Sequence, residues 1–547
     1  MPVPLSAAAG RSMKSINWRK ILICPSLVSF SVVFSKLQQP RRLGMMTTIV
    51  MVAAMVIVLC GSSSNGHVSL ASAAPIGPPN LFACTTPRPP QPNCCLPVPS
   101  SRPSAFAINS STPLRTRRAL QNVLQDARYL ARLNAAYTRL RRLEREAPND
   151  PRGLEQQRKL HCAFCSEPLV YGSQYNMHGD WFFLPWHRML LYYHERILAW
   201  ATGDVSFALP FWNWDSDAAA QKALPSPYAN TTSALYTARR RAAAGIQTRL
   251  QREITRDELF SGIGSVTGPD DVIGTAGNRG YLEGYGHGAV HNAVGQEQPP
   301  HRDMGDLAWA GYDPVFYAHH ANVDRMWSVW RQLPGRSDPT SADFRNSRFV
   351  FYDENANAKI IAVSDVLDHA TNLRYVYENV PNSWARARRG ASPAVADDGV
   401  PGELPLRVRR TFQASVTVSA ENPNVATAFV QSPETTPRRG VVPKLTLRNV
   451  AHSLAEPLAL YVFINEPDAG ANTPRAGNPR YVGARYLVAG GMSMPVSFTF
   501  PISLTLDGLN LSLSSNFTVQ VVRSVEFGAS RPALSIQSID YVHDPQV

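Results

Sequence analysis

The sequence predicts a targeting segment, a mainly helical domain and a C-terminal all-β sandwich domain. Before residue 386, hydrophobic residues recur at helical spacing in several segments. After residue 405 they alternate with polar residues over short stretches separated by Pro, Gly and Asn. The 547 residues are 44% hydrophobic and 17% charged, which is typical of a globular chain with a sizeable core. We expect four parts, namely a signal, a helical domain, a linker and a β domain: 1–73, 74–385, 386–405 and 406–547.

The first segment has the composition of a cleaved targeting peptide. Residues 1–73 carry seven of the 54 Lys and Arg and no Asp or Glu. The pair Arg41-Arg42, the apolar run Leu43–Cys60 and the small-residue triplet at 71–73 favour plastid import followed by transfer to the thylakoid lumen. Two alternatives stay open. About 18 apolar residues can just span a bilayer, and a plain secretory signal would lead to the secretory pathway or vacuole. We expect no stable membrane span in the mature form.

The charge of the remaining chain argues against a nucleic-acid partner. Without the seven basic residues of the first segment, the formal net charge falls from +13 to +6. The longest basic run is only Arg239 to Arg241. Nucleic-acid binding normally needs a much stronger basic patch, so we expect no nucleic-acid partner.

The helical domain begins with an irregular segment. Nine prolines lie between Pro75 and Pro99, which predicts a surface strap held by disulfides over residues 74–105. Helical spacing then predicts helices over 115–145 and 187–201, with Pro185 just ahead of the second.

A third helix has clear end signals. Asp313 can accept the free N–H groups of the first turn, and Pro314 suits the first helical position. Pro334-Gly335 ends the helix. Beyond the Arg-, Gly- and Pro-containing linker, five segments predict strands of a half-buried antiparallel sheet: 415–418, 444–447, 458–464, 496–500 and 517–521.

Histidines form two groups within the helical domain. Nine of the 13 histidines lie between His161 and His320. Neutral imidazole is a good ligand for Cu, Zn, Fe and Ni, whereas Mg and Ca prefer oxygen ligands. Neither group is accompanied by an acidic cluster, so ligand type leaves copper and zinc as candidates. The groups are His161, His178, His187 and His194, and His287, His291, His301, His319 and His320.

The spacing within the second group places pairs of side chains on the same face of a helix. His287 and His291 are four residues apart, as are His320 and Asp324. The Asp324 carboxylate could orient a metal-bound ring directly or through a neighbour. His319 points about 100° away from His320 on a helix, and we expect it to be a packed histidine that binds no metal. The aromatic residues around His178 and His187 predict a dry pocket wall.

At these residues the chain resembles the type-3 copper proteins, and specifically the plant polyphenol oxidases. The resemblance covers nearly the whole chain. It rests on five blocks: the mature start Ala74-Pro75-Ile76, the His161–Cys165 block, His178 with 183–188 and Glu195, the run 313–324, and 373–378 with Trp384.

The resemblance implies a catalytic domain built on a four-helix bundle with a dicopper core. His161, His178 and His187 would hold one copper, and His287, His291 and His320 the other. The implied activity is oxidation of o-diphenols to o-quinones, with O2 as co-substrate and small phenols as substrates. The C-terminal domain would keep the enzyme latent until a protease cuts the linker.

The resemblance also accounts for the cysteines. Five of the seven lie after residue 73, an odd number that composition alone leaves open. In the family, the second Cys of the first block forms a thioether to a copper ligand, which here implies Cys165 with His178. The implied disulfides are Cys84–Cys95 and Cys94–Cys162.

Three further residues receive roles from the resemblance. Glu283 stands where the family has a water-holding carboxylate, and Asn292 follows His291. The pair implies hydroxylation of monophenols in addition to catechol oxidation. Leu307 replaces the Phe that shields the second copper in the family, which predicts a smaller gate that admits bulkier substrates.

Two other functions use the same residues. A haemocyanin-like oxygen carrier shares the dicopper site, but plastid-type targeting and a single catalytic unit argue against it. A specialised biosynthetic phenol oxidase would be separated from a general enzyme by a substrate panel.

Overall fold

The computed structural model describes residues 74–545 apart from short gaps. The described residues belong to one compact unit, Ser72–Val547. Among them, no helix has both the length and the apolar character needed to cross a bilayer. The predicted signal and most of the linker lie outside the described residues. The gaps are 88, 90, 167–168, 387–403, 406–408, 433–437, 440, 454, 492–494 and 525–533.

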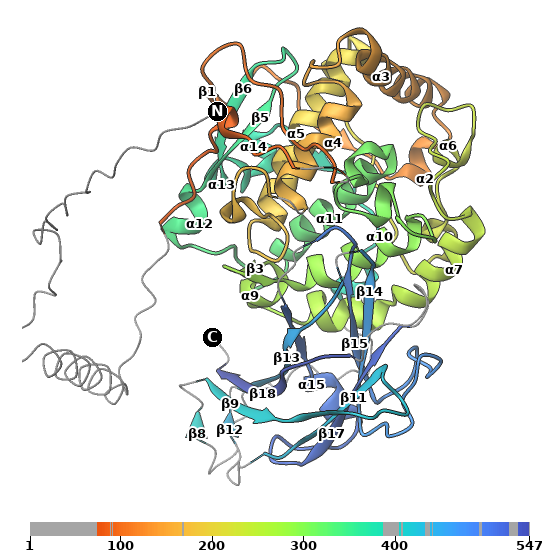
Figure 1. The fold of residues 1–547 in the computed structure, drawn as a ribbon, viewed down its shortest axis with the longest axis vertical. Coiled ribbons are helices and arrows are strands. Elements are labelled where there is room, and N and C mark those ends of the chain that lie inside the picture. Colours follow the sequence, from red (N-terminus) through yellow and green to blue (C-terminus); the bar gives the residue numbers. More distant parts are fainter. Residues whose placement is uncertain are drawn as a thin grey trace, which may run out of the picture. The chain divides into compact units, whose positions relative to one another are not determined.

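Helices form the first part of the described chain, drawn in orange to green in Figure 1. The three long helices are α3 (Ala127–Glu146), α5 (Phe183–Thr202) and α11 (Pro314–Arg331), and α5 packs against both of the others. α4 (Leu154–Cys165) packs against α3, and α10 (Gly288–Val294) packs against the shorter helix α7 (Ala243–Glu253). The shorter helices are α2 (Leu120–Val123), α6 (Ser226–Ala229), α7 (Ala243–Glu253), α8 (Arg256–Leu259), α9 (Pro269–Val272), α12 (Ala342–Asn346), α13 (Val363–Val366), α14 (His369–Asn372) and α15 (Ser503–Gly508). Single turns are η1 (Leu81–Ala83), η2 (Ser173–Tyr175), η3 (Ala219–Lys222), η4 (Phe260–Gly264), η5 (Glu283–His287), η6 (Asp303–Gly305), η7 (Ala310–Tyr312) and η8 (Ser383–Ala385).

The helix predicted over 115–145 is wrong at its start. Residues 115–117 form strand β2 (Arg115–Arg117), which pairs in parallel with β7 (Tyr375–Tyr377). A strand points alternate side chains to one face, so Arg115 and Arg117 both reach the buried carboxylate of Glu195, at 2.9 and 2.8 Å. This buried ion pair overrides the local helical pattern.

The other two predicted helices are confirmed, with small shifts of their ends. Asp313 accepts the backbone N–H of Val315 at 3.0 Å, and Pro314 is the first residue of α11. α11 ends at Arg331, ahead of Pro334. α5 begins at Phe183, so Pro185 lies inside its first turn, where its missing N–H costs no helical hydrogen bond.

The C-terminal part is an antiparallel β-sandwich. One sheet has the order β10-β11-β17-β14-β15, and the other has the order β16-β13-β18-β9. Apolar side chains of both sheets share one core, as expected for two facing sheets. The strands are β9 (Arg410–Ala414), β10 (Val416–Val418), β11 (Val425–Val430), β13 (Val441–Val450), β14 (Leu458–Ile464), β15 (Tyr481–Leu487), β16 (Val496–Pro501), β17 (Phe517–Arg523) and β18 (Ser538–Pro545). The remaining strands are β1 (Ser104–Ala105), β3 (Gly274–Thr275), β4 (Asn278–Arg279), β5 (Arg348–Tyr352), β6 (Ala358–Ala362), β8 (Leu404–Pro405) and β12 (Arg438–Arg439).

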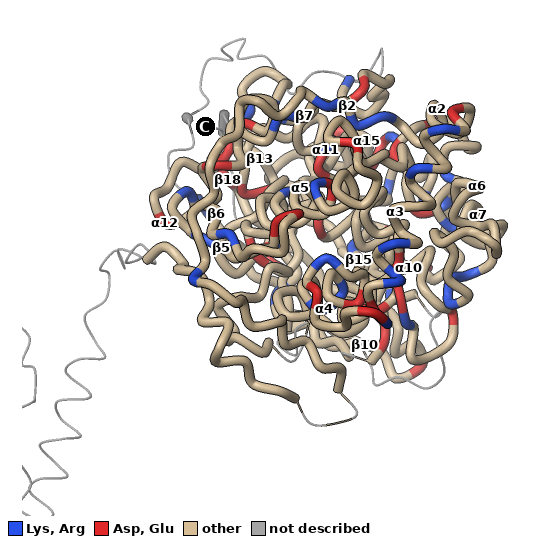
Figure 2. The backbone as a smooth tube through the Cα atoms, turned by 90° about the horizontal axis from the view of Figure 1, so that it is seen from above, with Lys and Arg blue, Asp and Glu red and all other residues tan. Residues whose placement is uncertain are grey.

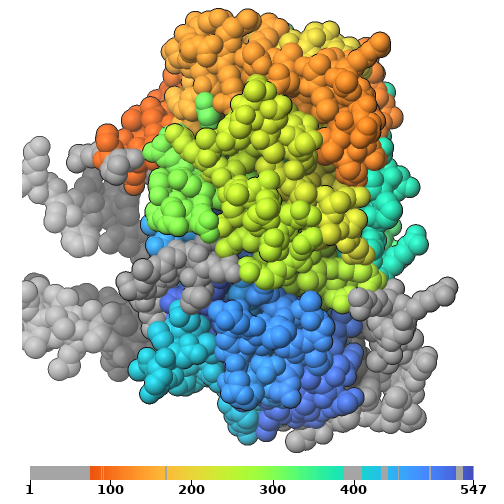
Figure 3. Space-filling model, turned by 90° about the vertical axis from the view of Figure 1, so that its right-hand side faces the viewer, coloured from red at the N-terminus to blue at the C-terminus, as the bar shows by residue number. Residues whose placement is uncertain are grey.

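Strand β14 joins the two parts because both of its faces are buried. Leu460 and Val462 belong to the core of the sandwich, whereas Tyr461 and Phe463 belong to the core of the helical part. Successive side chains of a strand point to opposite faces, so a continuous apolar run serves both cores. Figure 1 shows β14 and β15 reaching toward α10, and Figure 3 shows the blue C-terminal atoms packed against the yellow-green atoms of the helical part.

Charged residues of both signs are interspersed along the described chain (Figure 2). Several are buried and paired. Asp324 on α11 accepts from Arg188 on α5 at 2.6 Å, and from the hydroxyl of Tyr375 at 2.6 Å. Removal of one partner would leave an uncompensated buried charge, so this network fixes α5 against α11.

Candidate metal centre

The structure brings the six predicted histidine ligands into two adjacent groups. In each group, the candidate ligand atoms lie within 4.8 Å of one another. The rings of His187 and His320 stack at 4.3 Å between centroids, so the two groups touch. The first group takes His161 from α4, His178 from the loop after η2 and His187 from α5; the second takes His287 from the end of η5, His291 from α10 and His320 from α11.

Protein acceptors orient five of the six rings through the Nδ1 atom. His178 Nδ1 lies 3.2 Å from the Glu283 carboxylate. A carbonyl oxygen only accepts hydrogen bonds, so Nδ1 carries the proton wherever it faces one, and the lone pair is then at Nε2. The carbonyl contacts are His161 to Leu307 (2.9 Å), His187 to Phe183 (2.8 Å), His287 to Glu283 (3.2 Å) and His291 to Met304 (2.6 Å).

The Nε2 atoms lack the partners that buried polar atoms normally have. Among the described residues, the buried Nε2 atoms of His161, His178 and His287 have no hydrogen-bond partner. His291 Nε2 and His320 Nε2 face each other at 3.4 Å. Unpartnered buried lone pairs are costly, and a bound cation between them removes that cost. The donor set therefore fits a pair of metal ions held mainly by imidazole, with the Cys165 sulfur also within the first group.

Burial keeps these rings neutral. It lowers the pKa of all six histidines below the ordinary value, and the neighbouring imidazoles add to the effect at His161 and His320. A metal ligand must present a free lone pair, so neutral rings are ready to bind a metal without first losing a proton.

His319 lies closer to the second group than the sequence predicts. Its ring nitrogen falls within the same 4.8 Å cluster as those of His287, His291 and His320. Its ring also lies 5.6 Å from Trp214, whereas His320 is the ring that stacks on His187. The view that His319 is a packed histidine stays a prediction.

The cysteines lie around the first group. The disulfide Cys84–Cys95 lies within the N-terminal strap, and Cys94–Cys162 ties the strap to α4 beside His161. Cys165 is buried and free. Its sulfur lies within 4.8 Å of the ligand nitrogens of the first group and 3.9 Å from His187 Nε2.

Glu283 is held by three donors. It accepts from Arg279 at 2.7 Å, from the backbone N–H of Gly179 at 2.8 Å and from His178. Burial raises the pKa of Glu283 to about 7, although Arg279 and the Gly179 N–H act in the opposite direction. Arg279 lies four residues before Glu283, a spacing that sequence reasoning could have used to find this pair.

Asn292 and Leu307 both contact the C-terminal part. The Asn292 amide donates to the carbonyl of Leu487 at 3.2 Å, and the Leu307 N–H donates to the carbonyl of Ala489 at 2.9 Å. The backbone carbonyl of Leu307 accepts from His161 of the first group. The gate role of the Leu307 side chain at the second copper stays a prediction.

Asp324 does not orient His320 directly, as the spacing had suggested it could. Its carboxylate oxygens accept hydrogen bonds from Arg188, Tyr375 and Tyr377, at donor–acceptor distances of 2.5 to 2.6 Å. It therefore acts on the framework of the site, because these contacts hold the helices that carry His187 and His320.

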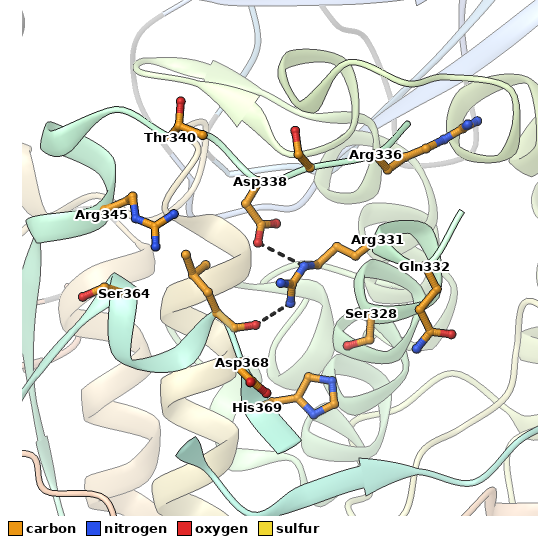
Figure 4. Close-up of a pocket in the computed structure, with 12 residues that line it drawn as sticks. Ser328, Arg331, Gln332, Arg336, Asp338, Thr340, Arg345, Ser364, Asp368 and His369 are labelled. Carbon is orange, nitrogen blue, oxygen red and sulfur yellow. Dashed lines mark hydrogen bonds and ion pairs between the residues drawn. The ribbon is translucent and has the colours of Figure 1, made fainter. Parts of the chain in front are cut away.

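A separate polar pocket lies at the C-terminal end of α11 (Figure 4). It has a volume of about 610 Å³, and none of the six histidines lines it. Arg331 points toward Asp338, with 3.0 Å between the paired atoms.

Several contacts of the site had no signal in the sequence. The carbonyls of Phe183, Met304 and Leu307 act through the backbone, so no side chain marks them. The rings of Phe183 and Phe316 lie 4.7 Å from those of His287 and His161, and they wall the space between the groups.

Comparison with known proteins agrees with this arrangement. The family "Common central domain of tyrosinase" matches residues 151–253 and 257–333, and "Polyphenol oxidase middle domain" matches 338–389. A curated relative, the latent chloroplastic polyphenol oxidase of Prunus armeniaca, is 36% identical over 364 residues, which are 60% of this chain and 59% of the relative. The chain thus spans less than two thirds of that relative's length.

Solved structures extend the comparison. The polyphenol oxidase of Grenache (Vitis vinifera) is 33% identical with a TM-score of 0.51, and the match covers 57% of this chain and 99% of that one. A latent aurone synthase, at 23% identity and a TM-score of 0.71, matches 87% of this chain and all of its own length, and it supports the fold including the C-terminal sheets. The chain belongs to the tyrosinase family and, within it, to the plant polyphenol oxidases.

Proposed function

We propose that this protein is a copper-dependent polyphenol oxidase that oxidises catechols to o-quinones with O2. The observation that carries the proposal is the set of six buried imidazoles whose Nε2 atoms converge in two touching groups. In the reaction, two catechols lose two electrons and two protons each, and one O2 becomes two waters.

The residues fit two copper ions. His161, His178 and His187 would hold one ion, and His287, His291 and His320 the other. Bound copper supplies the electron transfer between phenol and O2, which no protein side chain provides. The protein fixes the rings through Nδ1, and its aromatic walls exclude water from the site.

The proposal includes hydroxylation of monophenols. Glu283 is buried beside His178 and is the carboxylate available to accept the phenol proton, directly or through water. Asn292 presents a buried Oδ1 that has no partner among the described residues. Leu307 would set the width of the entrance.

A thioether between Cys165 and His178 belongs to the same proposal. A bond from the Cys165 sulfur to a ring carbon of His178 removes two hydrogens, and the proposed copper and O2 chemistry supplies the oxidant. The closeness of Cys165 to the first group supports it. Mass spectrometry of the peptide pair tests it, because the linked peptides weigh less by the two lost hydrogens.

Maturation and latency complete the proposal. We assign residues 1–73 to a cleaved signal for the thylakoid lumen, in keeping with relatives described as chloroplastic, with the secretory pathway as the alternative. A catalytic domain at 74–385 would be kept latent by a shielding domain at 406–547 until a protease cuts the linker at 386–405. Sequencing the mature N-terminus tests the first step and predicts Ala74.

One experiment tests the activity. Oxygen uptake is measured with 4-methylcatechol and with tyramine, on the copper-loaded chain cut at the linker, with the copper-free chain as control. Uptake with the catechol supports the oxidase, and uptake with tyramine supports hydroxylation. A copper-loaded chain that consumes no oxygen with either phenol would refute the proposal.

A further inference from the structure

A short turn supports one histidine of each group. Asp303–Leu307 contains η6 and lies between the two groups. The carbonyl of Met304 accepts from His291 Nδ1 at 2.6 Å, and the carbonyl of Leu307 accepts from His161 Nδ1 at 2.9 Å. A shift of this turn would therefore tilt two predicted ligand rings together, one in each group.

The C-terminal part forms a backbone hydrogen bond with this turn. The segment Leu487–Gly491 begins at the last residue of β15, and its Ala489 carbonyl accepts the Leu307 N–H at 2.9 Å. Asp306 and Ala489 form an isolated parallel bridge. The Leu487 carbonyl also accepts from Asn292, the residue next to His291.

Gly490 allows the close approach of the segment to the turn. It has a φ of +76°, which disfavours any residue with a side chain. A Cβ at this position would lie 2.5 Å from the Asp306 Oδ1 atom. The glycine therefore permits a close contact between the segment and the turn that a residue with a side chain would prevent.

We propose that the segment Leu487–Gly491 is a positioning element of the metal site, and that it helps to hold copper in addition to shielding it. The proposal rests on the proposed dicopper function. The chain of contacts runs from the Ala489 carbonyl to the Leu307 N–H, and from the Leu307 carbonyl to His161; the same turn also holds His291. Release of the C-terminal part would then expose the site and loosen its ligands in one event.

Matched glycine variants separate docking from backbone strain. Gly490→Ala adds a Cβ that collides with Asp306, whereas Gly477→Ala adds one at a φ of +75° with nothing within 4 Å. Both sites lie in the C-terminal part.

Copper retention is the first readout. Copper-loaded full-length chains are mixed with a chelator, and the rate of copper loss is followed by absorbance. Partners that orient metal ligands contribute about 10- to 100-fold to metal affinity, so Gly490→Ala should lose copper about 10-fold faster than the wild type. Gly477→Ala should lose it at the wild-type rate. Equal rates in all chains would overturn the proposal.

Hydrogen exchange supplies a readout that needs no activity and no variant. Linkage requires that copper binding strengthen any contact that strengthens copper binding. Copper loading of the wild type should therefore slow amide exchange at Leu307 and across 487–491, relative to the copper-free chain. Unchanged exchange at 487–491 would refute a positioning role even if Gly490→Ala fails to fold. A chain that binds no copper at all would instead refute the proposed function, whatever its exchange pattern.

Discussion

The two histidine groups are secured in different ways. The first takes its rings from three separate segments. It also has two cysteines nearby, because Cys162 forms a disulfide beside His161 and Cys165 lies among the rings. The second has no cysteine in its cluster. Two of its rings lie four residues apart across η5 and α10, next to the strand β15 of the C-terminal part.

This difference indicates how each group resists disturbance. Loops can be held in place by covalent links, so the scattered first group gains from the strap and its disulfides. In the second group, His287 bonds the Glu283 carbonyl one turn earlier and His291 bonds the Met304 carbonyl, and the helical segments of both pack against β15. Changes in the strap should therefore disturb the first group. Changes at the C-terminal contact should disturb the second group and, through Leu307, His161 of the first.

The largest expected effect comes from the two adjacent histidines of α11. His320→Gln should abolish copper binding in the second group and lower oxygen uptake more than about 100-fold, since loss of a ligand costs more than loss of the partner that orients it. His319→Gln should cost less than about 10-fold. Copper content and oxygen uptake of both variants check this, and the reverse order would make His319 the ligand.

The next effect concerns the ion pairs that hold the two groups together. Asp324→Asn leaves Arg188 without its buried partner and should lower the free energy of unfolding by about 3–5 kcal/mol. Asp126→Asn is the control, because Asn caps the start of α3 as well as Asp does. Urea unfolding at neutral pH measures both.

The pH dependence of the same network has a definite sign. Arg188 and Arg117 overcome burial and hold the pKa of Asp324 at about 2, below the ordinary value of 3.8. A carboxyl with a lowered pKa stabilises the fold above its ordinary value, and this stability is lost as pH falls toward 2. The stability gap between wild type and Asp324→Asn should thus narrow in acid; a constant gap would contradict this role.

Disulfide loss should act mainly on the first group. Cys94–Cys162 closes a loop with a sequence separation of 68, and its loss should cost about 4 kcal/mol. Cys84–Cys95 spans 11, and its loss should cost about 3 kcal/mol. Thermal unfolding of Cys94→Ser and Cys84→Ser compares them. Copper should be lost first from His161, His178 and His187 in Cys94→Ser. Loss from the second group first would contradict the view that this disulfide secures the first group.

The smallest effect is expected where the C-terminal part meets the helical part. Glu258 accepts from the Ala484 N–H at 2.6 Å and from the Tyr481 hydroxyl at 2.9 Å. Burial raises the pKa of Glu258 to about 7, above its ordinary value of 4.5. The stability that comes from the neutral carboxyl is therefore complete below about 4.5 and is lost as pH rises through about 7.

Glu258→Gln tests this contact. In the chain cut at the linker, the C-terminal fragment should dissociate several-fold more at about pH 8 than at about pH 5, and the variant should flatten this dependence. Size-exclusion chromatography measures the free fragment, with the exposed Asp507→Asn as control. The same pH dependence in wild type and Glu258→Gln would remove Glu258 from the contact.

The sequence carried the parts of the fold that side chains encode locally. Asp313 and Pro314 predicted the start of α11, and the histidine positions predicted two groups. The two sets of three ligands came from the family resemblance, and His194 and His301 lie in neither cluster. Strand β2 was missed because the buried Glu195, distant in sequence, draws in Arg115 and Arg117. The carbonyls of Met304 and Leu307 act through the backbone, so side-chain patterns could not reveal them.

The most direct test of the two-copper site is anomalous X-ray diffraction at the copper edge, on crystals of the copper-loaded chain. Two copper peaks per chain are expected, one coordinated by His161, His178 and His187 and the other by His287, His291 and His320. A single peak, or a second peak coordinated by His319 in place of His320, would contradict the arrangement.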